Sequence, residues 1–336
     1  MTAPTVIADV TGRLGCLTLN RPAAINALTT EMVAILHRTL DAWATAPEIR
    51  AVLISGAGER GLCAGGDLRS MHADAVSGGT GTLDFFATEY RLNAAIAAYP
   101  KPVVAFMDGL VMGGGIGVSA HASIRVVTER SRLAMPEVGI GLHPDVGGSW
   151  LLSHAPGQLG THLALTGATI GAADAITAGL ADHHVPADRL PALRDALRDG
   201  DPAAAVAAAA TPPPPGDLDG ARPWIDSCYA ADTVAEIVDR LAAHPSPAAQ
   251  AAAKEIGTKS PTSLVVTLRS LRTAAGLPGM REALDQEYRL SAALLRLPDL
   301  AEGIRAQIID KDRRPRWNPA TLAEVSPAVV DACFAG

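Results

Sequence analysis

The sequence predicts an α/β fold followed by a helical C-terminal region. Short apolar runs of strand length alternate with helical patterns through residues 1–200, as in folds built on a parallel sheet. Residues 201–222 are rich in alanine and proline and end this alternation, and residues 223–336 show helical patterns alone. We therefore expect an α/β core at 1–200, a linker or loop at 201–222 and a helical region at 223–336.

The elements of the core are expected in a simple order. Two short apolar runs joined by Thr11 and Gly12 predict a pair of strands at 6–10 and 16–19. Thr29 or Thr30 can cap a helix that runs to about residue 45 and keeps its apolar side chains on one stripe. Continuous apolar runs then predict buried strands with helices between them; the strands are expected at 51–54, 102–106 and 124–127, and the helices at 83–98 and after Met112.

Composition and charge exclude several classes of protein. The 336 residues are 48% hydrophobic, as in globular chains, and the net charge of -7 disfavours binding to nucleic acids or anionic membranes. No apolar run is long enough to span a membrane, and the N-terminus lacks the features of a signal peptide, so we expect a cytoplasmic protein. Neither the four scattered cysteines nor the nine histidines show a metal-ligand spacing, and we expect no metal and no cofactor.

Two glycine-rich loops follow expected strands and expose backbone N–H groups. Gly114 lies in a run of glycines at 113–115, and Gly66 lies in a loop after strand 51–54, where α/β sheets place ligands. An oxyanion hole needs two donors about 3 Å from one oxygen, and two such loops can supply them. For the run at 113–115, tight helix packing and oxyanion binding stay equally open. A loose dinucleotide fingerprint at 115–120 is followed too early by an acidic residue, which makes NAD binding a distant alternative.

Two carboxylates eight residues apart lie in a segment rich in glycine and proline. Glu137 lies on a turn with apolar neighbours, so we expect a partly buried position and a raised pKa, which suit acid–base or nucleophilic work. Asp145 precedes two glycines and, taken alone, is interpreted as a turn residue. His143, between the two acids, is a candidate for lining the pocket, although a loop histidine is more often solvated, and this second interpretation is the expected one. No G-x-S-x-G motif occurs, which disfavours serine-hydrolase chemistry.

These residues resemble the crotonase superfamily, also called the enoyl-CoA hydratase/isomerase family. Its marks are LNRP at 19–22, NAL at 26–28, CAGGD at 63–67 and GGG at 113–115. Within the family the chain is most similar to a hydrolytic branch with a longer C-terminal region; the matching segments are FFATEY at 85–90, AMPE at 134–137, PDVGG at 144–148, SPTSL at 260–264, EYRLS at 287–291 and IDKD at 309–312. The resemblance runs from about residue 6 to residue 325 and leaves out 203–219.

The resemblance implies a fold, a substrate and a set of roles. The fold is a spiral of repeating ββα units, and the expected partner is an acyl-CoA, whose CoA is part of the substrate. The N–H groups of Gly66 and Gly114 would bind the thioester carbonyl oxygen, Glu89 would contact the acyl part, and Glu137 and Asp145 would be the reacting acids. The implied reaction is hydrolysis of a short-chain 3-hydroxyacyl-CoA, most of all 3-hydroxyisobutyryl-CoA of valine breakdown. A homo-oligomer, a trimer or a multiple of trimers, is also implied.

One departure from the family pattern bears on the choice of reaction. Hydratases of the family carry a second glutamate just before a Leu-Thr-Gly motif, here at 165–167, and this chain has His162 at that position. Because water addition to an enoyl double bond uses two carboxylates, hydrolysis is favoured. Enoyl-CoA hydration or isomerisation is the alternative, and a non-catalytic acyl-CoA-binding protein is a further one. Arg21, Arg60 and Lys101 are candidates for binding the CoA phosphates, among which the sequence does not choose.

Overall fold

The computed structural model describes residues 3–335 and has the mixed α/β architecture that the sequence predicts. Its contacts group the chain into two units. The sheet unit comprises Met1–Gly66, Thr88–Ala134 and Thr169–Gly216, and the helical unit comprises Asp67–Ala87, Met135–Ala168 and Asp217–Gly336. Each unit is thus assembled from separate stretches of the chain, and the domain bounds expected near residues 200 and 222 stay a prediction.

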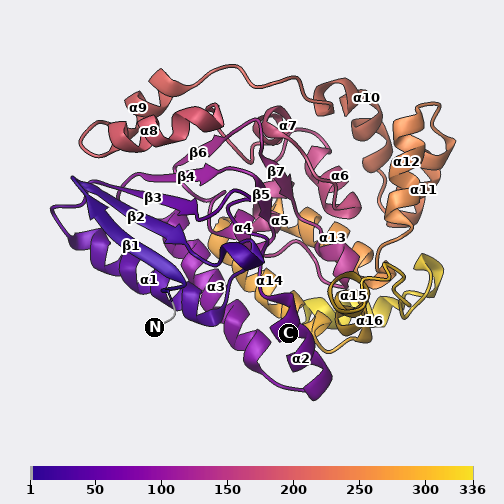
Figure 1. The fold of residues 1–336 in the computed structure, drawn as a ribbon. Coiled ribbons are helices and arrows are strands. Elements are labelled where there is room, and N and C mark those ends of the chain that lie inside the picture. Colours follow the sequence, from indigo (N-terminus) through magenta and orange to yellow (C-terminus); the bar gives the residue numbers. More distant parts are fainter. Residues whose placement is uncertain (1–2, 336) are drawn as a thin grey trace. The chain divides into compact units, whose positions relative to one another are not determined.

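The sheet unit is built on a six-stranded sheet in the order β1-β2-β3-β4-β6-β8. β1 runs antiparallel to β2, and all other neighbours in this sheet are parallel. β5 and β7 form a separate parallel pair. Figure 1 shows β1, β2 and β3 side by side at the indigo end of the chain. The strands are β1 Val6–Thr11, β2 Leu14–Leu19, β3 Ala51–Gly56, β4 Val103–Met107, β5 Leu110–Met112, β6 Ile124–Val127, β7 Arg132–Ala134 and β8 His183–His184.

The central strands are apolar on both faces, which is why they lie inside the unit. Val52 and Leu53 of β3 and Val104 of β4 are fully buried. Parallel strands that are covered on both sides read as such continuous apolar runs, and the strands predicted from these runs are confirmed with small shifts in their ends. β1, the outer strand, leaves most of its side chains exposed.

Helices cover both faces of the large sheet. On one face α8 (Leu190–Leu197) and α9 (Pro202–Ala209) pack against the strands, and Leu14, Leu53 and Val206 belong to their common apolar core. Since side chains alternate along a strand, the residue after Leu14 faces the other way, toward the opposite layer.

The opposite layer is α1 (Thr30–Thr45), the helix that the sequence predicts after Thr29. A Cβ at Gly15 would lie 2.5 Å from the ring of Trp43, so the glycine leaves the space that this indole fills. Thr29 caps the helix by accepting a hydrogen bond from the Met32 N–H at 3.2 Å, as expected.

The other helices of this part of the chain are short or shared. α3 (Gly81–Ala97) is the helix expected at 83–98, and its residues belong to both units. The helix expected after Met112 is a single turn, α4 (Gly114–Gly117). The sheet unit also contains α7 (Ala172–Thr177) and the 3-10 turns η1 (Pro22–Ala24) and η3 (Ala187–Arg189).

The segment expected as a linker, 201–222, is largely helical. The Asp201 carboxylate accepts a hydrogen bond from the Ala204 N–H at 2.8 Å, and Pro202 occupies the first turn of α9, where a proline is tolerated. The alanines that follow have the highest helix propensity. Residues 210–217, which contain the proline run, are the part without helix or strand.

The helical unit consists of helices joined by short turns, drawn in red to yellow from α10 onward in Figure 1. The helices expected near Thr262 and from Met280 are α13 and α14. Among residues 3–335, no helix is both long and apolar enough to cross a membrane. The helices are α2 Leu68–Ser77, α5 Gly148–Ser153, α6 Leu159–Thr166, α10 Leu218–Tyr229, α11 Val234–Ala243, α12 Pro247–Ile256, α13 Pro261–Ala274, α14 Met280–Leu294, α15 Pro298–Ile304 and α16 Pro327–Phe334. The unit also contains the 3-10 turns η2 Glu137–Ile140 and η5 Leu322–Glu324 and the short π-helix η4 Arg305–Ile309.

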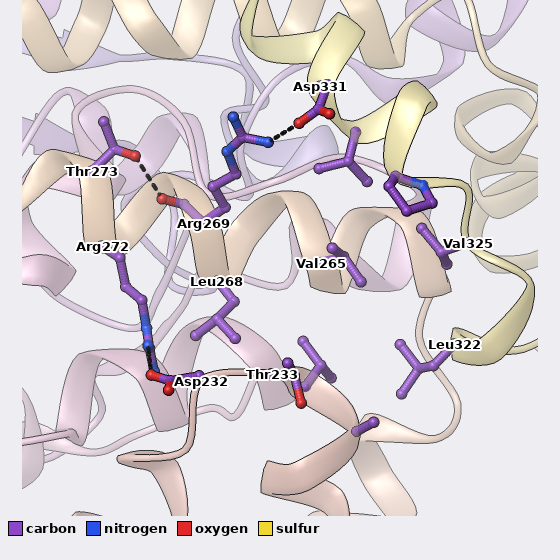
Figure 2. Close-up of a pocket in the computed structure, with 14 residues that line it drawn as sticks. Asp232, Thr233, Val265, Leu268, Arg269, Arg272, Thr273, Leu322, Val325 and Asp331 are labelled. Carbon is purple, nitrogen blue, oxygen red and sulfur yellow. Dashed lines mark hydrogen bonds and ion pairs between the residues drawn. The ribbon is translucent and has the colours of Figure 1, made fainter.

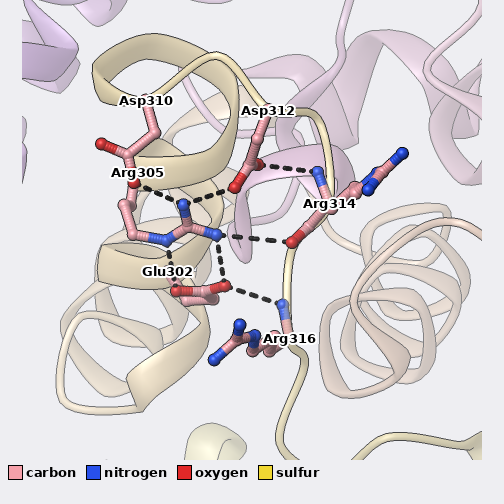
Figure 3. Close-up of polar contacts among 6 residues, drawn as sticks. All are labelled: Glu302, Arg305, Asp310, Asp312, Arg314 and Arg316. Atoms are coloured by element: carbon pink, nitrogen blue, oxygen red, sulfur yellow. Dashed lines mark hydrogen bonds and ion pairs between the residues drawn. The ribbon is translucent and has the colours of Figure 1, made fainter.

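Polar contacts fix the irregular stretch after α15. The Arg305 guanidinium pairs with the carboxylates of Glu302 at 2.9 Å, Asp310 at 2.6 Å and Asp312 at 2.8 Å (Figure 3). The Glu302 carboxylate also accepts a hydrogen bond from the Arg316 N–H at 2.8 Å. A stretch without regular structure is therefore held to the preceding helix by a charged network.

Candidate functional site

Gly66 and Gly114 lie next to each other in the sheet unit. Gly114 opens α4 directly after β5, and Gly66 ends the loop that follows β3. A Cβ built on Gly114 would lie 3.5 Å from the Gly66 nitrogen. The N–H groups at the start of a helix have no partner within the helix. The structure thus brings together the two backbone groups that the sequence selects as oxyanion donors.

Backbone hydrogen bonds set this neighbourhood. The Cys63 N–H donates to the Leu110 carbonyl at 3.1 Å, and the Met112 N–H donates to the Cys63 carbonyl at 3.0 Å. Gly65 has a φ of +98°, and a Cβ there would lie 3.2 Å from the Met112 oxygen. The loop before Gly66 is therefore fastened alongside β5, which leads into Gly114.

Glu89 completes the cluster in the sheet unit. It lies on α3 with only 2% of its surface exposed. A Cβ at Gly114 would lie 2.4 Å from the Glu89 Oε1 atom, closer than any real Cβ approaches an oxygen. A side chain at position 114 would therefore require the Glu89 carboxylate to move.

Cys63, the thiol in this neighbourhood, is not a nucleophile. Burial raises its pKa to about 12, and the negative charge of nearby Glu89 contributes to the rise. Since the thiolate is the reactive form of cysteine, the thiol stays inert at neutral pH.

Glu137 belongs to the helical unit and is the first residue of η2. It lies on a turn and is 5% exposed, as the sequence predicts for its position. The Ser260 N–H donates to the Val138 carbonyl at 3.1 Å. Gly141 ends the turn with a φ of +81°, and a Cβ there would lie 2.4 Å from the Asp299 carbonyl carbon. The turn is thus held by the start of α13 and lies directly against the backbone of α15.

Asp145 also belongs to the helical unit and is 4% exposed. Its carbonyl accepts a hydrogen bond from the Gly148 N–H at 2.6 Å, so it is a turn residue, as expected, but one with a buried side chain. Val146 and Gly147 follow with φ angles of 54° and 81°. Glycine adopts such angles readily, whereas a β-branched valine does so only under strain.

Glu287 is the residue that sequence reasoning missed. It lies on α14, is fully buried, and accepts hydrogen bonds from the Gly147 N–H at 2.7 Å and the Ser149 N–H at 2.9 Å. Burial raises its pKa to about 8, against the effect of its hydrogen bonds from Ser149 and Gly147, and the charge of Asp145 adds to the rise. The sequence does contain a sign that Glu287 is unusual, because this charged residue interrupts the apolar stripe of Leu284, Leu290 and Leu294.

His143 is buried, and the expectation of a solvated loop residue was wrong. Its Nε2 atom lies 3.1 Å from the Ser291 Oγ atom and its Nδ1 atom 3.0 Å from the Pro144 carbonyl oxygen. Burial lowers its pKa to about 4, so the ring is neutral at neutral pH. The sequence could not reveal that α14, far along the chain, covers this residue.

His162, which the resemblance aligns with the hydratase glutamate, packs against two aromatic rings. Its Nδ1 atom lies 2.8 Å from the Tyr229 hydroxyl, and its ring meets those of Trp224 and Tyr229 edge-on, with centroids at 5.4 Å and 5.2 Å. Burial lowers the pKa of His162 to about 4. The imidazole of His162 is therefore neutral at neutral pH.

A cavity of about 590 Å³ lies within the helical unit, among residues of α11, α13 and α16. Arg269 pairs with Asp331 at 2.6 Å, and Arg272 pairs with Asp232 at 3.1 Å (Figure 2). None of the five residues that the sequence proposes for the site lines this cavity. The predicted site and this hollow are therefore different places on the molecule.

The candidates for phosphate binding all contact backbone carbonyls of the sheet unit. The Lys101 ammonium donates to the Ala46 carbonyl at 2.7 Å, at the end of α1. Arg60 donates to the Pro22 carbonyl at 3.0 Å, and Arg21 donates to a carbonyl close by in the chain. Lys101 and Arg21 are half-buried in this role, whereas Arg60 is exposed.

Comparison with known proteins gives a family and close relatives. The family model for enoyl-CoA hydratase/isomerase matches residues 14–334. A relative from Gallus gallus named mitochondrial 3-hydroxyisobutyryl-CoA hydrolase is 41% identical, over 99% of this chain and 89% of its own. The protein of the same name from Homo sapiens is 39% identical, over 96% of this chain and 86% of its own.

Two solved structures are also similar along their whole length. A carnitinyl-CoA dehydratase from Mycobacterium thermoresistibile is 53% identical with a TM-score of 0.96, and it covers 99% of this chain and 96% of its own. An enoyl-CoA hydratase from Rhodobacter sphaeroides is 44% identical with a TM-score of 0.93, and it covers 99% of this chain and 97% of its own. The similar sequences are thus named as hydrolases and the similar structures as a dehydratase and a hydratase, and all of these names refer to CoA compounds.

Proposed function

Because the chain belongs to the enoyl-CoA hydratase/isomerase family, we propose that it hydrolyses 3-hydroxyisobutyryl-CoA to 3-hydroxyisobutyrate and CoA. Relatives that cover almost the whole chain at 39–41% identity carry the name of this hydrolase. The observation that carries the chemistry is that the Glu89 Oε1 atom and the Gly66 nitrogen lie 2.4 Å and 3.5 Å from the position of a Cβ on Gly114, so that one carboxylate and two glycine backbones are close neighbours. Such an arrangement suits a thioester carbonyl with a hydroxylated acyl chain beside it.

In the proposed mechanism, the N–H groups of Gly66 and Gly114 bind the thioester oxygen. Negative charge develops on this oxygen as the carbonyl carbon becomes tetrahedral, and two fixed donors stabilise it more than they stabilise the ground state. Glu89 contacts the acyl part, where its carboxylate can accept a hydrogen bond from the 3-hydroxyl group. In this proposal Glu89 binds the acyl group, and Gly66 and Gly114 activate its carbonyl.

Glu137 and Asp145 are the proposed reacting acids. Glu137 either attacks the carbonyl carbon, giving a mixed anhydride that water then opens, or removes a proton from an attacking water. Both routes break the carbon–sulfur bond and consume one water. Asp145 handles the proton that the departing CoA sulfur needs or that the water loses. The products are the free carboxylic acid and the CoA thiol.

Addition or removal of water at an acyl-CoA is the second candidate. The similarity to structures named dehydratase and hydratase, at 53% and 44% identity, favours it. His162 opposes it, since a neutral histidine held by Tyr229 replaces one of the two carboxylates that hydration uses. Hydrolysis therefore remains the first proposal.

A panel of substrates separates the two reactions. Release of free thiol is measured with 3-hydroxyisobutyryl-CoA, with shorter and longer 3-hydroxyacyl-CoAs and with unsubstituted acyl-CoAs, and loss of the enoyl absorbance is measured with crotonyl-CoA. We expect thiol release with the hydroxyacyl substrates and an unchanged enoyl absorbance. Enoyl turnover without thiol release would overturn the proposal. Inactivity with every substrate would favour the alternative of a non-catalytic acyl-CoA-binding protein.

Several properties accompany this proposal. We propose a role in valine breakdown, a homo-oligomeric state of a trimer or a multiple of trimers, and activity without a metal or an added cofactor. The expected cytoplasmic location stays a prediction, and the relatives named above as hydrolases are mitochondrial. Light scattering on the purified protein tests the oligomeric state, and activity after treatment with a chelator tests the absence of a metal.

A further inference from the structure

We propose that Glu287 is a positioning residue, which holds the segment around Asp145 in the conformation that the reaction needs. The inference rests on the proposed hydrolysis, in which Asp145 moves a proton. Glu287 lies on α14 in the C-terminal region, 142 positions after Asp145 (287 − 145), and both residues belong to the helical unit.

Both oxygens of the Glu287 carboxylate bind the segment just after Asp145. The Oε2 atom accepts a hydrogen bond from the Gly147 N–H at 2.7 Å. The Oε1 atom accepts from the Ser149 N–H at 2.9 Å and from the Ser149 hydroxyl at 2.5 Å. Three hydrogen bonds thus fasten the two oxygens of Glu287 to two positions of this segment, Gly147 and Ser149.

The same helix holds the segment before Asp145. The neutral ring of His143 contacts the Ser291 hydroxyl at 3.1 Å and the backbone carbonyl of Glu287 at 3.3 Å. Asp145 therefore lies between two attachments to α14, one two residues before it and one two residues after it. A segment fixed at both sides has little freedom to turn its carboxylate.

Strain at Val146 explains why the clamp is needed. Val146 has a φ of 54° and is buried, and a β-branched residue held in this region is strained. Such a conformation persists only when the surrounding structure enforces it. The hydrogen bonds to Gly147 and Ser149 enforce it directly after the strained residue, and without them the backbone at Asp145 relaxes.

The clamp requires two oxygen acceptors, not merely a polar group of the same size. In Glu287→Gln, one oxygen becomes an NH₂ group that faces the N–H of Gly147 or of Ser149, so a donor meets a donor. We expect kcat to fall about 10- to 100-fold, since a displacement of about 1 Å in a reacting group costs a factor of this size. KM should stay within about threefold, because Glu287 acts through Asp145 and does not touch the substrate.

Steady-state hydrolysis by four proteins tests the inference: the wild type, Glu287→Gln, Asp145→Asn and the double variant. If Glu287 acts through Asp145, the double variant has the kcat of Asp145→Asn within about twofold, because a removed proton carrier cannot be misplaced further. Losses that multiply would contradict action through Asp145.

Gln286→Ala is the matched control for loss of stability. Gln286 is the neighbour of Glu287 on α14, is buried, and donates to the Ser270 hydroxyl at 3.0 Å on α13 instead of accepting from Gly147 or Ser149. It should lower the melting temperature and leave kcat unchanged. Amide hydrogen exchange should become faster at Gly147 and Ser149 in Glu287→Gln and not in Gln286→Ala.

The outcomes separate this inference from the proposed function. A wild type that releases no CoA sinks both. A wild type that hydrolyses the thioester, together with a Glu287→Gln variant of undiminished kcat, sinks the positioning role alone. If Glu287→Gln does not fold, Ser149→Ala carries the test, because it removes only the hydroxyl donor; a kcat equal to that of the wild type then overturns the inference, and a several-fold lower kcat at unchanged KM supports it.

Discussion

Glu287 accepts a hydrogen bond from the Gly147 N–H at 2.7 Å, although 140 positions separate the two residues in the chain. Through this contact the helical C-terminal region reaches the segment that carries Asp145. The turn that carries Glu137 is supported in the same way, since Gly141 lies against the backbone of α15 at Asp299. The C-terminal helices thus support both acids that we propose for the reaction.

The raised pKa of Glu287 predicts how stability varies with pH. Burial raises its pKa from 4.5 to about 8. Between these values the folded protein binds a proton that the unfolded chain has lost, so the stability that is present below about pH 4.5 is lost as the pH rises toward 8. Relative to Glu287→Gln, the wild type should lose up to about 1.4 kcal/mol of unfolding free energy per pH unit in this window. Urea unfolding of both proteins from pH 5 to pH 9 measures the difference, and parallel curves would rule out the shift.

Gly114→Ala should damage the proposed oxyanion site more than it damages the fold. The new methyl group would lie 2.4 Å from the Glu89 Oε1 atom and 3.5 Å from the Gly66 nitrogen, so the carboxylate or the loop must move. We expect kcat/KM to fall about 100-fold, as when an oxyanion donor is lost, at a cost in stability of about 1–3 kcal/mol.

Gly220→Ala is the control for the previous variant. Gly220 is exposed on α10, and a Cβ there meets nothing within 4 Å. It should keep full activity and gain up to about 1 kcal/mol of stability, because alanine favours a helix. Equal kinetics for Gly114→Ala and Gly220→Ala would speak against a role for position 114.

His162 should carry no proton in the reaction. Burial lowers its pKa to about 4, so the ring is neutral throughout the range in which the enzyme is assayed. His162→Gln keeps a polar partner for the Tyr229 hydroxyl and should retain thiol release within about threefold from pH 6 to pH 9. A 100-fold loss, or the disappearance of one limb of the pH profile, would make His162 an acid–base residue.

Much of the fold follows from local patterns along the chain. The apolar runs of β3 and β4 and the threonine cap of α1 are properties of neighbouring residues, and each was predicted. In the segment 201–222 two local signals compete: the prolines predict a linker, whereas Asp201 and the following alanines favour α9, which forms.

The support of the candidate site could not be predicted in this way. Burial of Glu287 and His143 depends on α14 packing against a segment more than a hundred positions earlier. The pattern shows only a charged residue on an apolar stripe, and it does not show which backbone N–H groups that residue meets. Local patterns indicated Gly66, Gly114 and Glu137. Resemblance added Glu89 and the role of Asp145, but neither shows what holds these residues in place.

The central claim is that a carboxylate of this chain carries out thioester hydrolysis, and one measurement tests it most directly. The rate of CoA thiol release from 3-hydroxyisobutyryl-CoA is compared between the wild type and Glu137→Gln, with substrate binding measured for both. We expect many turnovers by the wild type and a rate at least about 10³-fold lower for the variant, which still binds the substrate. Thiol release by Glu137→Gln at a rate near that of the wild type would contradict the account.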